Sequence, residues 1–252
     1  MTQIISVHSF RGGTGKSNTT ANLAALIMRQ GKRVGIIDTD IQSPGIHILF
    51  GMSGESIPYS LNDYLWGRCT IEQAAHDVTA RIGVTDGAGM AYLIPSSMRP
   101  GEIARVLRDG YNVGLLSDGI RQVIAALDLD VLLIDTHPGL NEETLLSIAI
   151  SNTLLVVMRP DEQDYEGTGV AIKVARRLEV QQMLLIVNKT PKAFDPQQVK
   201  DQVENTYDCE VAAVLRHSDD LMMLGSRDIF VNRFPEHDLT VQYKKILARI
   251  MP

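Results

Sequence analysis

The segment Ser9-Phe10-Arg11-Gly12-Gly13-Thr14-Gly15-Lys16-Ser17 decides the fold of this chain. It follows the apolar run 4–7, which is typical of a buried strand, and it precedes residues 18–30, where apolar side chains recur on one face of a helix. Glycines in such a turn let successive backbone N–H groups point inward, and the N-terminus of the following helix adds the positive end of its dipole. The order of strand, glycine-rich turn and helix therefore predicts a phosphate-binding loop.

Two side chains of this loop suit a triphosphate and its metal ion. The Lys16 ammonium would reach the β- and γ-phosphates, and the Ser17 hydroxyl would ligate Mg²⁺. A glycine-rich turn without a ligand is the alternative, but a Gly-Lys-Ser ending between a strand and a helix favours the phosphate-binding loop. The predicted nucleotide-binding residues of the loop are Gly12, Gly13, Thr14, Gly15, Lys16, Ser17 and Asn18.

Two further apolar runs end in carboxylates. Residues 34–37 are followed by Asp38 and Asp40, and residues 131–134 are followed by Asp135. Ligands of open parallel sheets lie beyond the carboxyl ends of the strands, so these side chains are expected beside the phosphates. Asp135 has the Walker B form, in which the carboxylate holds Mg²⁺ through water. Helix capping or solvent exposure is the alternative for the aspartates after the second strand, and the neighbouring loop favours a functional role, with Asp40 ahead of Asp38.

The composition limits the classes of protein that fit. The 252 residues suit one large α/β domain or two small ones, and the net charge of −6 provides no overall basic field that would attract nucleic acid. The two cysteines, Cys69 and Cys209, match no metal or redox spacing. No apolar run approaches the roughly 18 residues of a membrane span, and no signal peptide precedes the first strand. We expect a reduced, cytoplasmic protein.

The remaining patterns predict one doubly wound, mostly parallel α/β sheet with helices on both faces. Strands and helices alternate along the chain without a linker or an internal repeat, which favours a single domain over residues 1–252. Further strands are predicted at 91–94, 154–158, 183–187 and 210–215. Helices are predicted at 61–66, 71–75, 100–109, 115–127, 169–178, 196–206 and 239–251.

The loop departs from the usual P-loop spacing, because Phe10 stands where a glycine is expected six residues before the lysine. The run from Arg11 to Ser17 resembles the deviant Walker A box of the ParA/MinD family, K-G-G-x-G-K-[ST]. Arg11 stands at the family's signature lysine, which crosses a dimer interface to the partner's phosphates. Residues 38–44 resemble the family's switch I, and residues 135–139 resemble its D-x-x-P-G switch II.

The resemblance implies roles for individual residues. Asp40 would orient the attacking water or bind Mg²⁺ through water. Asn188, after the strand at 183–187, stands at an adenine-contacting position, and Pro235 lies in a stretch that resembles the loop closing over the base. His137 departs from the family, which usually has a small or apolar residue there, and an unspecific role is favoured for it over a contact to phosphate or water.

The resemblance also implies a function. It indicates a P-loop NTPase of the SIMIBI type that binds ATP or ADP with Mg²⁺, dimerises with ATP, and hydrolyses it slowly under the stimulation of a partner. Lys16, Asp40 and Arg11 would be the catalytic residues, and such an ATPase would act in spatial positioning, in partitioning or in regulating a partner. The alternative is a nucleotide-binding scaffold with little or no hydrolysis, because the signature lysine is missing. The C-x-x-C of iron–sulfur carriers in this superfamily is absent.

A protein partner or cargo is the expected type of partner. Arg216, Arg227 and Arg233 occupy the stretch where DNA-binding relatives contact phosphates, but the acidic residues interleaved with them weaken a DNA role. The amphipathic helix at 239–251 is better explained by packing against the sheet than by binding to a membrane surface.

Overall fold

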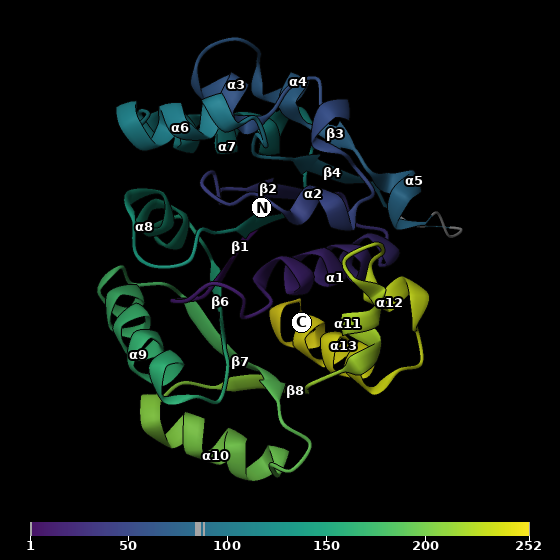
Figure 1. Ribbon diagram of the computed structural model, residues 1–252, viewed down its shortest axis with the longest axis vertical. Helices are drawn as coiled ribbons and strands as arrows, with labels where there is room; N and C mark the ends of the chain where they lie inside the picture. Colours follow the sequence, from purple (N-terminus) through teal and green to yellow (C-terminus); the bar gives the residue numbers. More distant parts are fainter. Residues whose placement is uncertain (1, 84–86, 88, 252) are drawn as a thin grey trace.

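Eight strands form one sheet in the order β3-β4-β2-β5-β1-β6-β7-β8 (Figure 1). The computed structural model describes residues 2–83, 87 and 89–251. β3 runs antiparallel to β4, and the other neighbouring strands pair in parallel. The strands are β1 (Gln3–His8), β2 (Val34–Asp38), β3 (His76–Asp77), β4 (Ala91–Ile94), β5 (Val131–Asp135), β6 (Thr153–Met158), β7 (Gln182–Thr190) and β8 (Val211–Arg216).

Helices cover both faces of this sheet (Figure 1). The longer helices are α1 (Lys16–Arg29), α6 (Pro100–Asp109), α7 (Val113–Ala126), α8 (Glu142–Ala149), α9 (Glu162–Arg177), α10 (Pro196–Tyr207) and α13 (Asp238–Ile250). The shorter ones are α2 (Ile46–Leu49), α3 (Leu61–Leu65), α4 (Ile71–Ala74), α5 (Thr79–Ile82), α11 (Asp219–Leu224) and α12 (Phe230–Arg233), with a 3₁₀ turn at Gly54–Ser56.

The hydrophobic core lies on both faces of the sheet, because successive side chains of a strand point to opposite faces. Ile5, Val7, Ile36 and Leu133 point to one face, where α1 and α13 pack over them. On the other face, α7 covers β2 and β5, while α9 and α10 cover β6, β7 and β8. β2, β5 and β6 are buried along their whole length, which explains why their sequences read as continuous apolar runs. The doubly wound, mostly parallel sheet predicted from the sequence is confirmed.

Several element boundaries differ from the prediction. α9 begins at Glu162 and not near residue 169, because Asp161 caps it and accepts a hydrogen bond from the Asp164 N–H at 3.0 Å. The sequence analysis missed the first turns of α9, because the helix contains glycines, which have a low helix propensity. β3, α2, α5, α8, α11 and α12 were not predicted. Within the described residues, no helix is long and apolar enough to cross a membrane.

Candidate nucleotide-binding site

Residues 9–15 form a turn between the central strand β1 and the N-terminus of α1. Gly13 and Gly15 have φ angles of 75° and 103°, in the left-handed region that glycine adopts without strain. Lys16 begins α1 and is only 7% exposed, so its ammonium is held inside the site. The geometry explains why the sequence needs glycine at two separate points of this turn.

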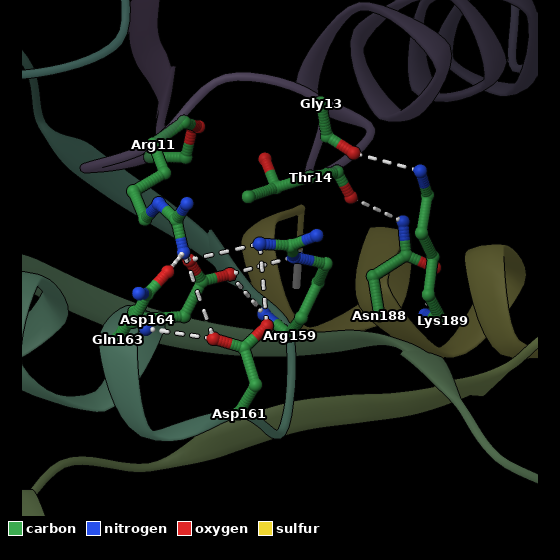
Figure 2. A network of polar contacts seen from close by, with 10 residues as sticks. Arg11, Gly13, Thr14, Arg159, Asp161, Gln163, Asp164, Asn188 and Lys189 are labelled. Carbon is green, nitrogen blue, oxygen red and sulfur yellow. Dashed lines mark hydrogen bonds and ion pairs between the residues drawn. The ribbon is translucent and has the colours of Figure 1, made fainter.

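β7 holds the turn from one side. Between its pairings Val187↔Val214 and Thr190↔Arg216, β7 contains one residue more than β8, and Lys189 takes a φ of 55°. Such a bulge redirects side chains, and here it aims two of them at the loop (Figure 2). The Asn188 amide donates to the Thr14 carbonyl at 2.7 Å, and the Lys189 ammonium donates to the Gly13 carbonyl at 2.7 Å.

α9 holds the turn from the other side, through Arg11 (Figure 2). The Arg11 guanidinium donates to the Gln163 side chain and lies 3.8 Å from carboxylate oxygens of both Asp161 and Asp164. Arg159 binds the same two carboxylates more closely, at 3.2 and 3.1 Å. Arg11, which is 39% exposed, therefore lies against the N-terminus of a helix of its own chain.

Two buried carboxylates stand at the ends of neighbouring strands. Asp38 of β2 and Asp135 of β5 are paired in register. Burial raises the pKa of Asp135 to about 6, against the opposing effects of the Lys16 ammonium and a hydrogen bond from Ser17. Burial, together with the charges of Asp135 and Asp40, raises the pKa of Asp38 well above its usual value. This cluster of negative charge needs a cation beyond Lys16 to be stable when ionised.

Asp40 is oriented by groups that the sequence did not predict. Its Oδ1 lies 2.7 Å from Nδ1 of His137 and accepts the Ser43 N–H at 3.0 Å. His137 comes from the loop after β5, so the contact joins the two segments that resemble switch I and switch II. No sequence pattern predicts the contact between His137 and Asp40, because it depends on the conformations of two loops and the two residues are 97 positions apart.

A cavity of about 520 Å³ opens beside the loop. Of the predicted site residues, the structure brings together Gly12, Gly13, Gly15, Lys16, Ser17, Asn18, Asp40 and Asn188 around it. Thr14, Arg11 and Asp135 lie outside its lining, and Thr14 and Asp135 are buried. The wall that the sequence analysis missed consists of Ser43, Pro138, Lys189, Arg216, His217, Ser218, Leu221, Met222, Gly225 and Ser226.

The structure does not place Pro235 in this cavity. Pro235 lies in an exposed turn between α12 and α13, where its carbonyl accepts a hydrogen bond from Lys244 at 3.4 Å. The side of the cavity that Pro235 was expected to close is formed by the segment from the end of β8 through α11. The expectation relied on the resemblance of this stretch to the loop that closes over the base in relatives.

Residues 1–243 match the ParA profile, described as NUBPL iron-transfer P-loop NTPase. The chain belongs to the ParA family of P-loop NTPases. The resemblance seen in the loop at residues 11–17 is thereby confirmed at the level of the family.

The sequence relatives of this ParA-family chain are described as proteins of different functions. An uncharacterized ATP-binding protein of Methanocaldococcus jannaschii is 28% identical over 185 residues, which are 73% of this chain and 63% of that protein. An iron-sulfur cluster carrier protein of the same organism is 31% identical over 193 residues, which are 73% of this chain and 59% of the carrier. The chain thus spans about 60% of the length of these relatives.

A solved structure agrees with the fold over the whole chain. The septum site-determining protein MinD of Pyrococcus horikoshii, complexed with Mg-ADP, superposes with a TM-score of 0.81 at 21% identity, covering 100% of this chain and 96% of that one. At this level of identity the likeness shows the fold of the ParA-family chain.

The residues of the ParA-family chain fit a magnesium nucleotide. The cavity volume is in the usual range for small-molecule sites, and the buried Lys16, the Ser17 hydroxyl and the Asp40 carboxylate line it. Among the described residues, the Oδ2 atom of Asp38 is buried without a hydrogen-bond partner. No group of three or more histidine, cysteine or acidic residues among the described residues is arranged to hold a metal alone.

Proposed function

We propose that this chain binds ATP with Mg²⁺ and hydrolyses it slowly, in a cycle coupled to dimerisation. The observation that carries the proposal is the convergence of Lys16, Ser17 and Asp40 on one cavity, with the buried Asp135 directly behind them. A structural glycine turn would require neither a buried lysine nor carboxylates whose pKa values are raised by burial.

Each side chain has a role in this proposal. The Lys16 ammonium and the backbone N–H groups of the loop would neutralise and orient the phosphates. Ser17 and Asp135 would hold Mg²⁺, Asp135 through water, and Asp40 would orient the attacking water or share the metal's water shell. The bound metal would spread the charge that develops on the phosphate oxygens.

Asn188 supports recognition of the base. One N–H of its amide is used by the Thr14 carbonyl, and its oxygen accepts the Lys189 N–H at 2.8 Å. A carboxamide has two N–H groups and two acceptor sites, so one of each remains for the donor and acceptor edge of adenine. The bond to Thr14 fixes the amide at the end of the cavity next to the loop.

The two proposed functions, an ATPase and a scaffold, differ in the role of Arg11. In the ATPase reading, Arg11 would leave Gln163 and α9 and reach the phosphates of a second copy, as an arginine can do with its forked guanidinium. In the alternative reading, Arg11 stays on α9 and the chain is a nucleotide-stabilised scaffold. The contacts of Arg11 with its own chain are the specific observation in favour of the scaffold.

Iron–sulfur cluster carriage receives less support. The chain has two cysteines, and they pack in different hydrophobic clusters, Cys69 beside Trp66 and Cys209 beside Met183. Burial raises the pKa of both thiols to about 11. Within one chain, these two side chains do not form a shared binding site.

A phosphate-release assay tests the proposal. We expect the purified chain to release phosphate from ATP only with Mg²⁺, and Lys16→Ala and Asp40→Asn to reduce the rate at least about tenfold. Adding DNA, liposomes or a candidate partner protein would show which of them stimulates the rate. Tight Mg-ATP binding without any phosphate release would contradict the ATPase reading and favour the scaffold.

A further inference from the structure

The loops after β2 and β5 face each other beside the cavity, and one hydrogen bond joins their side chains. His137 and Asp40 are mostly buried, with side chains 20% and 15% exposed, and Nδ1 of the imidazole lies 2.7 Å from Oδ1 of the carboxylate. A carboxylate only accepts hydrogen bonds, so Nδ1 carries the proton. The contact is therefore a directed N–H···O bond between the two loops.

A further hydrogen bond holds the backbone of each partner, His137 and Asp40. The His137 carbonyl accepts the hydroxyl of Thr144, at the start of α8, at 3.2 Å. The Asp40 N–H donates to Oδ1 of Asp38 at 3.0 Å. Each loop is thereby tied to a rigid element next to it, α8 on one side and the end of β2 on the other, so His137 and Asp40 meet in one geometry.

The two hydrogen bonds to the Asp40 carboxylate leave one of its oxygens available. The His137 imidazole and the Ser43 N–H both donate to Oδ1. Within the part of the chain that the structure describes, Oδ2 accepts no hydrogen bond, and Asp40 lines the cavity. Fixing one oxygen of a carboxylate fixes the direction of the other, which is the oxygen that would meet a water molecule.

We propose that His137 is a positioning residue, which holds Oδ1 of Asp40 so that Oδ2 faces the cavity and which locks the two loops together. This inference rests on the proposed function, in which Asp40 orients the attacking water. His137 itself does not line the cavity. Its loss should therefore affect the chemical step and leave the affinity for the nucleotide unchanged.

The test compares His137→Ala with His137→Asn, in which the amide nitrogen can take the place of Nδ1. We expect His137→Ala to lower kcat at least about tenfold with KM and the Mg-ATP dissociation constant within about twofold of the unchanged protein. His137→Asn should recover most of kcat. His76→Ala is the matched control, since His76 makes one hydrogen bond, to the Tyr59 carbonyl at 2.7 Å, in the distant strand β3.

A second measurement needs no turnover. A double-mutant cycle of His137→Ala and Asp40→Ala on nucleotide-free protein should give non-additive losses of Tm, because each change removes the same hydrogen bond. Additive losses would overturn the proposal, and so would equal losses of kcat in the alanine and asparagine variants, or a loss confined to KM. If the unchanged protein releases no phosphate while the cycle is non-additive, the proposed function fails, and with it the hydrolytic role of His137, whereas the contact itself stands.

Discussion

At the scale of residues, the buried carboxylates Asp38 and Asp135 affect the stability of the nucleotide-free fold. Their side chains lie at the ends of adjacent strands, and burial raises the pKa of each. At neutral pH their ionised forms therefore destabilise the nucleotide-free fold. In the proposed function, bound Mg²⁺ would reduce this penalty.

Asp135→Asn should raise Tm of the nucleotide-free protein at pH 7.5, by roughly 3 °C or more. The pKa of Asp135 is about 6 in the folded chain and 3.8 in the reference state, so the folded state binds this proton more tightly. The contribution of Asp135 to stability therefore falls as pH rises from about 4 to about 6 and stays low above that. The gain from Asp135→Asn should shrink when thermal unfolding is repeated at pH 5. A lower Tm at pH 7.5, or a gain that does not change with pH, would contradict this explanation.

For single residues, the sequence predicted which side chains belong to the site better than it predicted which side chains contact one another. Lys16, Ser17 and Asp40 could be placed because each follows a strand that a run of apolar residues defines. The His137–Asp40 bond and the contacts of Arg11 could not, because they depend on loop conformations and on a helix N-terminus distant in sequence. Pro235 was placed by analogy with a position in the chain, and the turn that carries it lies outside the cavity.

At the scale of elements, α9 supports the phosphate-binding loop by packing as well as by charge. Phe10 stands where an ordinary P-loop has glycine, and its ring lies over Gly167. A Cβ atom at Gly167 would come within 2.1 Å of Phe10 Cδ1. The missing side chain in α9 therefore makes room for the extra ring in the loop.

Gly167→Ala should displace Phe10 and with it the start of the loop. We expect a loss of stability on the order of 1–3 kcal/mol in thermal or urea unfolding, and weaker Mg-ATP binding. Gly169→Ala is the matched control in the same helix, because its Cβ would lie 3.5 Å from Tyr207, an ordinary contact. It should leave binding unchanged and stability equal or slightly higher, since alanine favours a helix. Equal effects of the two substitutions would show that Phe10 does not need the space at Gly167.

The elements of the sheet could be predicted because parallel strands covered on both faces are uniformly apolar. The short helices α2, α11 and α12 were not predicted, because four to six residues are too few to show a helical period by themselves. α3 and α4 are of similar length and were predicted. α11 matters most among them, because Leu221 and Met222 form part of the cavity wall. The unpredicted part of the site thus lies partly on α11, and otherwise at the ends of β7 and β8 and in the loops after β2 and β5.

At the scale of the whole molecule, the proposed function asks whether Arg11 completes the site of a second copy or stays on its own chain. Its guanidinium lies against Gln163 and the carboxylates at the N-terminus of α9, and the same side chain would have to turn outward to serve a second copy. These contacts are partly exposed, so they are weak enough for a phosphate to replace them.

Adding Mg²⁺ and a non-hydrolysable ATP analogue should shift the mass measured by light scattering from the 27.8 kDa monomer toward a dimer. Arg11→Ala should abolish this shift and reduce phosphate release. Arg249→Ala is the control, because Arg249 forms its ion pair with Glu210, next to the amino end of β8. If Arg11→Ala leaves both the dimer and the ATPase rate unchanged, Arg11 has no role across an interface.

The central claim is that the loop at residues 9–17 binds a triphosphate together with its metal. Isothermal titration of the nucleotide-free chain with ATP, with Mg²⁺ and with EDTA, measures this directly. We predict saturable binding that depends on Mg²⁺ and that Lys16→Ala weakens at least about tenfold, because the buried ammonium is lost. The same weak signal with and without Mg²⁺, unchanged by Lys16→Ala, would contradict the account.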